Sequence, residues 1–166
     1  IYIQTPYATA NRTFLKNLTQ ICKSVKTAVF QTNSLQSSPN FPAFSNYISQ
    51  RKKFIETGIE LYEYQSKDSI HGKSICMDKR LSAVGTYNLD DRSFYINTES
   101  MLIIDSPEFA EILIDAMGKD REKSLKVNRE NQYEQDNKVE ELQCTVMKKA
   151  AMYLVSIFSR IVPFLI

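Results

Sequence analysis

The sequence predicts an α/β fold, a mixed β-sheet flanked by helices on both faces. Short runs of β-branched and aromatic residues alternate with amphipathic stretches at helical spacing, and the predicted connections include both crossovers and one tight hairpin. The chain of 166 residues suits one domain of ordinary size. Apolar residues make up 43% and charged residues 24%, a composition typical of a globular protein rather than a disordered one.

The first 64 residues predict alternating strands and helices. The strands are assigned from β-branched and aromatic runs, and the helices from apolar residues at helical spacing. In chain order, we expect a strand at 1–5, a helix with its apolar positions over 14–25 after the cap-like Asn11, a strand at 25–32, a polar loop at 35–42, a helix over 44–55 that stops at Gly58, and a strand at 58–64.

A hairpin, a strand and a helix follow. Residues 71–77 and 81–87 both have strand patterns, and the short polar break at 78–80 between them predicts a hairpin. Residues 99–104 predict the last strand. Ser106, followed by a proline at the first helical position, predicts the start of a helix with an apolar face over 109–117.

The remainder of the chain is predicted to be a C-terminal extension. Residues 119–143 are mostly polar, with charges of both signs, which favours a solvated linker or an exposed helix. Residues 146–166 are apolar at helical spacing, and this pattern is typical of a helix that caps the core or of an interfacial helix lying on a membrane. We therefore divide the chain into a first unit, residues 1–118, and an extension, residues 119–166.

Charge and cysteine content exclude some classes of protein. The formal net charge of +2 is too small to imply a nucleic-acid partner by itself. The three cysteines are odd in number and far apart, so they predict neither a disulfide framework nor a zinc site, and a reducing compartment is expected. The sequence begins with Ile1 rather than Met, and we expect the chain to have been cut or processed from a longer protein.

Polar groups suited to an anion converge at the predicted hairpin. His71 is the only histidine in the chain, and Lys73 follows it two residues later, on the same face of the predicted strand. Pairing of residue 77 with residue 81 would bring 87 beside 71, so that Thr86 and Asn88 lie near both side chains. An imidazole, an ammonium and an amide donor at one patch suit an oxyanion such as a phosphodiester.

Two other sites are excluded by the sequence. Residues 72–74 look like the tail of a phosphate-binding P-loop, but that motif needs glycine at position 67, where Lys67 stands, and it should open a helix. One histidine and scattered cysteines provide no ligand set for a metal, so we expect no metal and no cofactor.

Several motifs accompany the residues of the predicted hairpin. The segment HGKSICMD at 71–78 fits the H-x-K-x-x-x-x-D pattern, and the segments 84–88, 91–93 and 97–99 fit G-S-x-N, R-S and N-x-E. A multi-part motif of this kind is highly specific. Together with the segments 4–7, 32–34, Arg51 and 58–64 outside the motif, these segments resemble the phospholipase D superfamily and are closest to the second half of bacterial cardiolipin synthase-like proteins. The resemblance covers residues 1 to about 117, with Thr86 where serine is usual.

The resemblance implies a role for each matching side chain. His71, Lys73 and Asp78 form the His-Lys-Asp motif, in which His71 is the nucleophile or the acid. Asp78, in the turn, is expected to support the structure of the motif. Lys73, Thr86 and Asn88 would bind phosphate oxygens. Glu99 would orient the imidazole and stabilise its charged form.

The resemblance also implies a partner and a substrate. The fold would be one half of the pseudo-twofold phospholipase D fold, because one histidine attacks phosphorus to form a phosphohistidine and another protonates the leaving alkoxide. The second half is either the N-terminal half of the same protein or a homodimer mate. We expect a phospholipid phosphodiesterase or phosphatidyltransferase that performs hydrolysis or cardiolipin-type transfer. We expect it to be membrane-associated, at the bacterial inner membrane or its cytoplasmic face, and to bind no nucleic acid. The alternatives are an endonuclease of the same superfamily and a non-catalytic, membrane-binding half.

Overall fold

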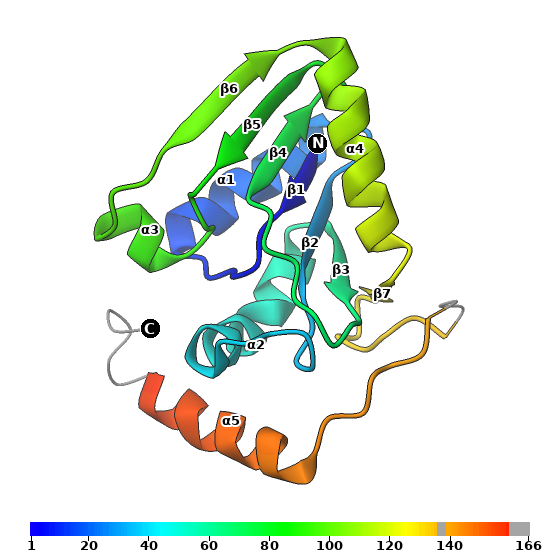
Figure 1. Cartoon of the computed structure of the whole chain (residues 1–166). Coiled ribbons are helices and arrows are strands. Elements are labelled where there is room, and N and C mark those ends of the chain that lie inside the picture. Colours follow the sequence, from blue (N-terminus) through cyan, green and yellow to red (C-terminus); the bar gives the residue numbers. More distant parts are fainter. Residues whose placement is uncertain (136–138, 160–166) are drawn as a thin grey trace.

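A seven-stranded mixed sheet organises the computed structural model, which describes residues 1–135 and 139–159 (Figure 1). Its strands are β1 (Tyr2–Gln4), β2 (Val29–Asn33), β3 (Glu60–Tyr64), β4 (Ser74–Met77), β5 (Leu81–Gly85), β6 (Met101–Asp105) and β7 (Ser124–Val127), in the spatial order β6-β5-β4-β1-β2-β3-β7. Strands β1, β2 and β3 are parallel, and the remaining neighbours pair antiparallel. The predicted mixed sheet is therefore confirmed.

Helices cover both faces of the sheet, as predicted (Figure 1). They are α1 (Arg12–Ser24), α2 (Phe41–Glu56), α3 (Asp91–Tyr95), α4 (Pro107–Arg121) and α5 (Val146–Ser159). The β-sheet register places Ile3, Phe30 and Leu61 side by side on one face, where they form a core with α1 and α2. Helix α4 contacts β3, β4, β5 and β7, and α5 packs against α2.

The predicted helix starts are confirmed by their caps. The Asn11 side chain accepts a hydrogen bond from the backbone N–H of Phe14 at 2.9 Å, and Ser106 accepts one from Phe109 at 3.2 Å. Each cap satisfies an amide that has no carbonyl partner in the first turn of its helix. Gly58 follows α2 with a φ of 91°, a conformation that glycine adopts without steric cost.

The hairpin has the predicted register but shorter strands. Met77 pairs with Leu81, as the sequence predicts. The strand expected from residue 71 begins at Ser74, because the neighbouring β1 ends at Gln4, the partner of Ser74. The prediction that His71 and Lys73 share a strand face is therefore wrong, since neither belongs to a strand.

Strand β7 corrects the prediction of a continuous polar linker. Ser124–Val127 pairs antiparallel with β3, and three of its four residues are buried. A four-residue edge strand containing a lysine is too short to show a clear period, so its pairing with a distant strand decides its conformation. The division at residue 118 stays a prediction, but the sheet continues to Val127. Helix α5 starts at Val146, where a helix was expected, and the rest of that expected helix, residues 160–166, lies outside the described residues. No described helix is long and apolar enough to cross a membrane.

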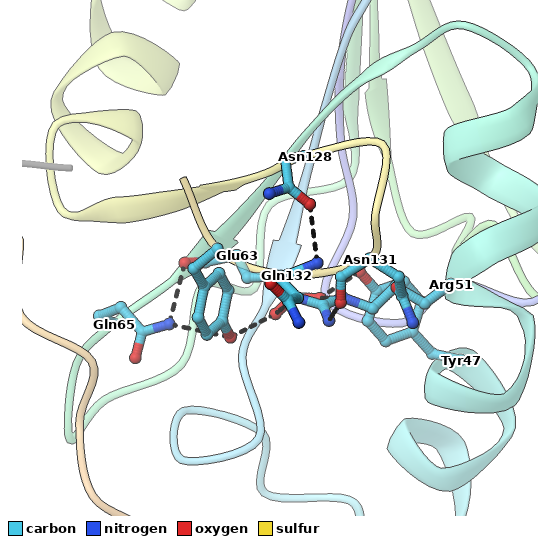
Figure 2. A network of polar contacts seen from close by, with 8 residues as sticks. Tyr47, Arg51, Glu63, Gln65, Asn128, Asn131 and Gln132 are labelled. Carbon is cyan, nitrogen blue, oxygen red and sulfur yellow. Dashed lines mark hydrogen bonds and ion pairs between the residues drawn. The ribbon is translucent and has the colours of Figure 1, made fainter. Parts of the chain in front are cut away.

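A buried ion pair ties the segment after β7 to the core (Figure 2). The Glu63 carboxylate, 1% exposed, lies 2.7 Å from Nε of Arg51 and accepts a hydrogen bond from its Nη2 at 3.1 Å. The hydroxyls of Tyr47 and Tyr133 donate to the same carboxylate at 2.6 and 2.5 Å. Arg51 also donates to the carbonyl oxygen of Asn131 at 3.0 Å. These contacts join α2, β3 and the chain beyond β7.

Candidate active site

The predicted site residues other than Asp78 gather at one edge of the sheet. Strands β1, β2 and β3 end there, β5 also ends there, and β4 and β6 begin there. The imidazole of His71 is exposed at this edge, whereas Lys73 is only 9% exposed. Nζ of Lys73 donates a hydrogen bond to the carbonyl oxygen of His71 at 3.0 Å. The ammonium group is therefore held next to the backbone that carries the imidazole.

The backbone before His71 is held by a buried asparagine at the end of β2. Asn33, fully buried, accepts a hydrogen bond from the N–H of Ile70 at 2.9 Å and donates to its carbonyl oxygen at 3.1 Å. The same amide donates to the carbonyl oxygen of Pro6 at 3.3 Å. Asn33 thus fixes the residue next to His71, a positioning role that was not predicted from the sequence. The only signal was its place in the segment 32–34 that resembles the superfamily.

The two strands of the hairpin remain paired up to the site. The N–H of Gly85 donates to the carbonyl oxygen of Lys73 at 3.2 Å, which extends the register of β4 and β5 by one residue. A Cβ atom at position 85 would clash with the carbonyl oxygen of Ser100, so the close approach of β6 requires glycine there. Thr86 and Asn88 follow directly, at the same edge as Lys73.

Ser93 links Asn88 to Glu99. Its hydroxyl accepts a hydrogen bond from the backbone N–H of Asn88 at 3.3 Å and donates to Oε1 of Glu99 at 3.0 Å. The amide of Asn97 donates to the same oxygen at 3.1 Å. The Asp90 side chain accepts from the N–H of Ser93 at 2.7 Å and caps α3. Residues 88–99 therefore form one hydrogen-bonded unit. The sequence pointed to Ser93 only through the R-S segment of the motif at 91–93.

The carboxylate of Glu99 is stabilised in its charged form. Hydrogen bonds from Thr86 and Asn97 lower the pKa of Glu99 below its ordinary value, and the charge of Lys73 acts in the same direction. Ser93 and Asn97 also fix the position of the Glu99 carboxylate, and no hydrogen bond joins it to His71 in the described part of the chain. The predicted orienting role of Glu99 stays a prediction.

The basic groups at the site are both destabilised in their protonated forms. His71 is exposed as a residue, but neighbouring atoms remove part of the water around its ring. This partial desolvation, followed by the nearby charge of Lys73, lowers the pKa of His71 below its ordinary value of 6.5. Burial also lowers the pKa of Lys73, while the charges of Glu99 and Asp90 oppose that shift. The imidazole is therefore biased toward the neutral form near neutral pH, which is the form able to attack phosphorus.

Asp78 lies away from the other predicted site residues. It occupies the β4–β5 turn with a φ of 53°, whereas His71 precedes the opposite end of β4. The four residues of β4 alone separate the two by about 13 Å. The structure thus brings together His71, Lys73, Thr86, Asn88 and Glu99 at one edge of the sheet and leaves Asp78 at the other.

A polar hollow of about 280 Å³ adjoins the site. Its lining residues come from the loop after β1, the start of α2 and the motif: Tyr7, Asn40, Pro42, Ala43, Asn88, Asp90, Arg92 and Asn97. Oδ1 of Asn88 is buried and has no hydrogen-bond partner among the described residues. A buried acceptor without a partner costs free energy, so a ligand or water that donates to it would be stabilised. Among the described residues, no group of three or more His, Cys, Asp or Glu side chains could hold a metal ion.

The sequence is similar to a known family and to several bacterial proteins. The family model for the PLD-like domain of cardiolipin synthase matches residues 1–121. An uncharacterized protein of Helicobacter pylori strain J99 is 32% identical over 124 residues, which cover 66% of this chain and 24% of that protein. Cardiolipin synthase 1 of Staphylococcus epidermidis is 28% identical over 131 residues, which cover 78% of this chain and 26% of that protein. The chain thus spans about a quarter of the length of these relatives.

Solved structures share the fold at low sequence identity. Phosphatidylserine synthase of Haemophilus influenzae Rd KW20 superposes with a TM-score of 0.68 and 17% identity, over 96% of this chain and 39% of that one. The phospholipase D family member Nuc of Salmonella typhimurium superposes with a TM-score of 0.64 and 16% identity, over 76% of this chain and 80% of that one. The predicted α/β half-domain fold of the superfamily is confirmed by these similarities.

Proposed function

The chain belongs to the PLD-like domain family of cardiolipin synthase, and we propose that it forms one catalytic half of a phospholipid phosphodiesterase or phosphatidyltransferase. The observation that carries the proposal is the meeting of His71, Lys73 and the unit around Asn88 and Glu99 at one sheet edge.

In the proposed reaction, His71 is the nucleophile. Its exposed, neutral imidazole attacks phosphorus, a P–N bond forms, and the P–O bond to the leaving alcohol breaks. The ammonium of Lys73 and the amide of Asn88 stabilise the charge on the non-bridging oxygens, with the hydroxyl of Thr86 nearby. Water or a lipid hydroxyl then attacks phosphorus and releases His71, giving hydrolysis or transfer.

The leaving alkoxide needs a proton that this chain does not supply. His71 is the only histidine of the sequence and is already used as the nucleophile. A second half of the same type would contribute the imidazolium that protonates the alkoxide. The second half is either another part of the same protein or a second copy of this chain. The assembled site would lie at a membrane surface, where the phospholipid is found.

Substitution of His71 tests the proposal in the assembled protein with both halves present. His71→Asn keeps a polar side chain of similar size, and turnover of vesicle phospholipid should fall by at least about 10³-fold because the nucleophile is gone. Trapping of a phosphorylated intermediate and its loss in the variant would identify the covalent step. Undiminished turnover would remove His71 from the mechanism.

A DNA substrate distinguishes the endonuclease alternative, which would use the same residues. The wild-type protein is incubated in parallel with anionic phospholipid vesicles and with single- and double-stranded DNA. We expect lipid turnover and no DNA cleavage, since the small net charge of +2 offers little attraction to a nucleic-acid backbone. Cleavage of DNA without lipid turnover would contradict the proposed substrate.

A further inference from the structure

Helix α5 turns an apolar face toward solvent. The helix packs against α2 (Figure 1), and Lys148 and Val155 are partly buried. The exposed residues among those with described side chains are Val146, Met147, Ala150, Ala151 and Leu154, which we call the outer face of α5. At about 100° per residue, these five lie within one arc of about 140°, and Lys148 and Val155 lie outside it.

The outer face is unusual for a helix on the surface of a globular protein. Such helices normally bury their apolar stripe and expose their polar one. Here the exposed fractions of Val146, Met147 and Leu154 are 82%, 84% and 64%. The five described residues of the outer face include no charged side chain. This face therefore has no covering element within the described part of the chain.

Helix α5 is attached at the same sheet edge as the candidate active site. Nζ of Lys148 donates a hydrogen bond to the carbonyl oxygen of Gln36 at 3.0 Å, shortly after the end of β2. The N–H of Leu142 donates to the side chain of Gln65 at 3.2 Å, and Gln65 directly follows β3. Both strands end at the edge that carries His71. A surface bound by α5 would consequently lie close to the site.

We propose that the outer face of α5 docks on the surface of a phospholipid bilayer. The inference rests on the proposed function, since the substrate would lie in that bilayer. The 14 residues of α5 extend about 21 Å, and the three large side chains exposed on this face, Val146, Met147 and Leu154, present roughly 200 to 350 Å² of accessible apolar surface. A stable protein interface needs about 800 Å² from each partner. A bilayer accepts a few apolar side chains without a matched surface, so it fits this small face better.

Vesicle flotation of the full chain tests the docking surface. The vesicles contain phosphatidylglycerol and phosphatidylcholine, and the wild-type chain should float with them. Met147→Glu and Leu154→Glu should each weaken the binding at least about tenfold, because each places a charge where an apolar side chain would enter the lipid. The matched control is Ile103→Glu on β6, where the side chain is 60% exposed, and its binding should equal that of the wild type.

Other outcomes would overturn the inference. Absence of flotation by the wild type, or equal flotation of the α5 variants, would show that this face does not bind lipid. A change of oligomeric mass in the α5 variants without vesicle binding would assign the face to a protein partner. Leu154→Gln, which keeps the helix propensity high, replaces the glutamate variant should that variant unfold. Turnover of soluble bis(p-nitrophenyl) phosphate by the assembled protein tests the proposed function separately and should be unchanged in the α5 variants.

Discussion

Two glutamates of this chain, Glu63 and Glu99, occupy opposite kinds of environment. Glu63 is buried, and its two oxygens are bound by the guanidinium of Arg51 and the hydroxyls of Tyr47 and Tyr133 (Figure 2). All of these donors belong to the chain itself. Because these donors occupy both oxygens of the carboxylate, Glu63 joins α2, β3 and the chain beyond β7.

Glu99 belongs to an arrangement that remains open to solvent. It is held by Ser93 and Asn97, and its charge faces the Lys73 ammonium. In the same region the imidazole of His71 is exposed and Oδ1 of Asn88 has no partner among the described residues. Polar groups with unused bonding capacity are typical of a binding site, so the contrast separates a structural carboxylate from the one that we propose to act in the site.

The largest effect on stability is expected at Glu63. Glu63→Ala should lower the free energy of unfolding by about 3–5 kcal/mol, because it leaves the buried guanidinium of Arg51 without its counter-charge. Urea unfolding monitored by tyrosine fluorescence measures the change. Glu63→Gln, which keeps two hydrogen-bonding groups, provides the milder variant if the alanine form does not fold. A loss below about 1 kcal/mol in both variants would show that the cluster contributes little.

The opposite pattern is expected at Glu99, with a loss of activity and little loss of stability. Glu99→Gln removes the negative charge beside Lys73 and should reduce phosphodiester turnover about 10²-fold, since Lys73, the proposed phosphate ligand, loses the carboxylate that favours its charged form. Turnover by the assembled protein and urea unfolding of the same variant provide the two readouts. Unchanged turnover would exclude a contribution of Glu99 to the chemistry. A loss of stability as large as that of Glu63→Ala would erase the contrast between the two regions.

A smaller effect concerns the titration of His71. Its NMR titration midpoint should lie below 6.5, and Lys73→Met should raise the midpoint only in part, because burial is the larger cause of the lowered pKa. The unfolded chain then binds this proton more readily than the folded one, so the contribution of His71 to stability is present above pH 6.5 and is lost as the pH falls through the folded pKa. Lys67→Met is the matched control and should leave the midpoint unchanged. A wild-type midpoint at or above 6.5 would contradict the prediction.

Local sequence signals predicted the site better than they predicted its supports. The hairpin register follows from the strand patterns on both sides of the break at 78–80, and the predicted pairing of residues 77 and 81 is confirmed. The positioning role of Asn33 depends on bonds to Pro6 and Ile70, which are remote in sequence. A buried side chain that joins distant loops leaves no period in the sequence, so that role could not be predicted.

Long-range pairing also explains the errors in the predicted elements. Strand β7 exists because its four residues meet the free edge of β3, and nothing in their own pattern distinguishes them from a linker. Strand β4 starts late because β1 is short. The sequence predicts Arg51 to lie in a helix and Glu63 to lie in a strand. The two form an ion pair only because α2 packs on β3. In each case the deciding partner lies far along the chain.

The ion pair of Arg80 and Asp105 is exposed, and we expect it to contribute the least to stability. The two side chains are 67% and 55% exposed, and two hydrogen bonds join them across β5 and β6. Their geometry is as close as that of Arg51 and Glu63, but water solvates both charges in the folded and the unfolded state, so the attraction is largely screened. Arg80→Ala should therefore leave the urea midpoint almost unchanged, although it removes the same type of guanidinium–carboxylate contact. A loss comparable to that of Glu63→Ala would mean that burial does not determine the strength of these pairs. If Glu63→Ala destabilises the protein much more than Arg80→Ala does, the stabilisation at Glu63 comes from the exclusion of water. Water is not excluded to the same extent around Glu99.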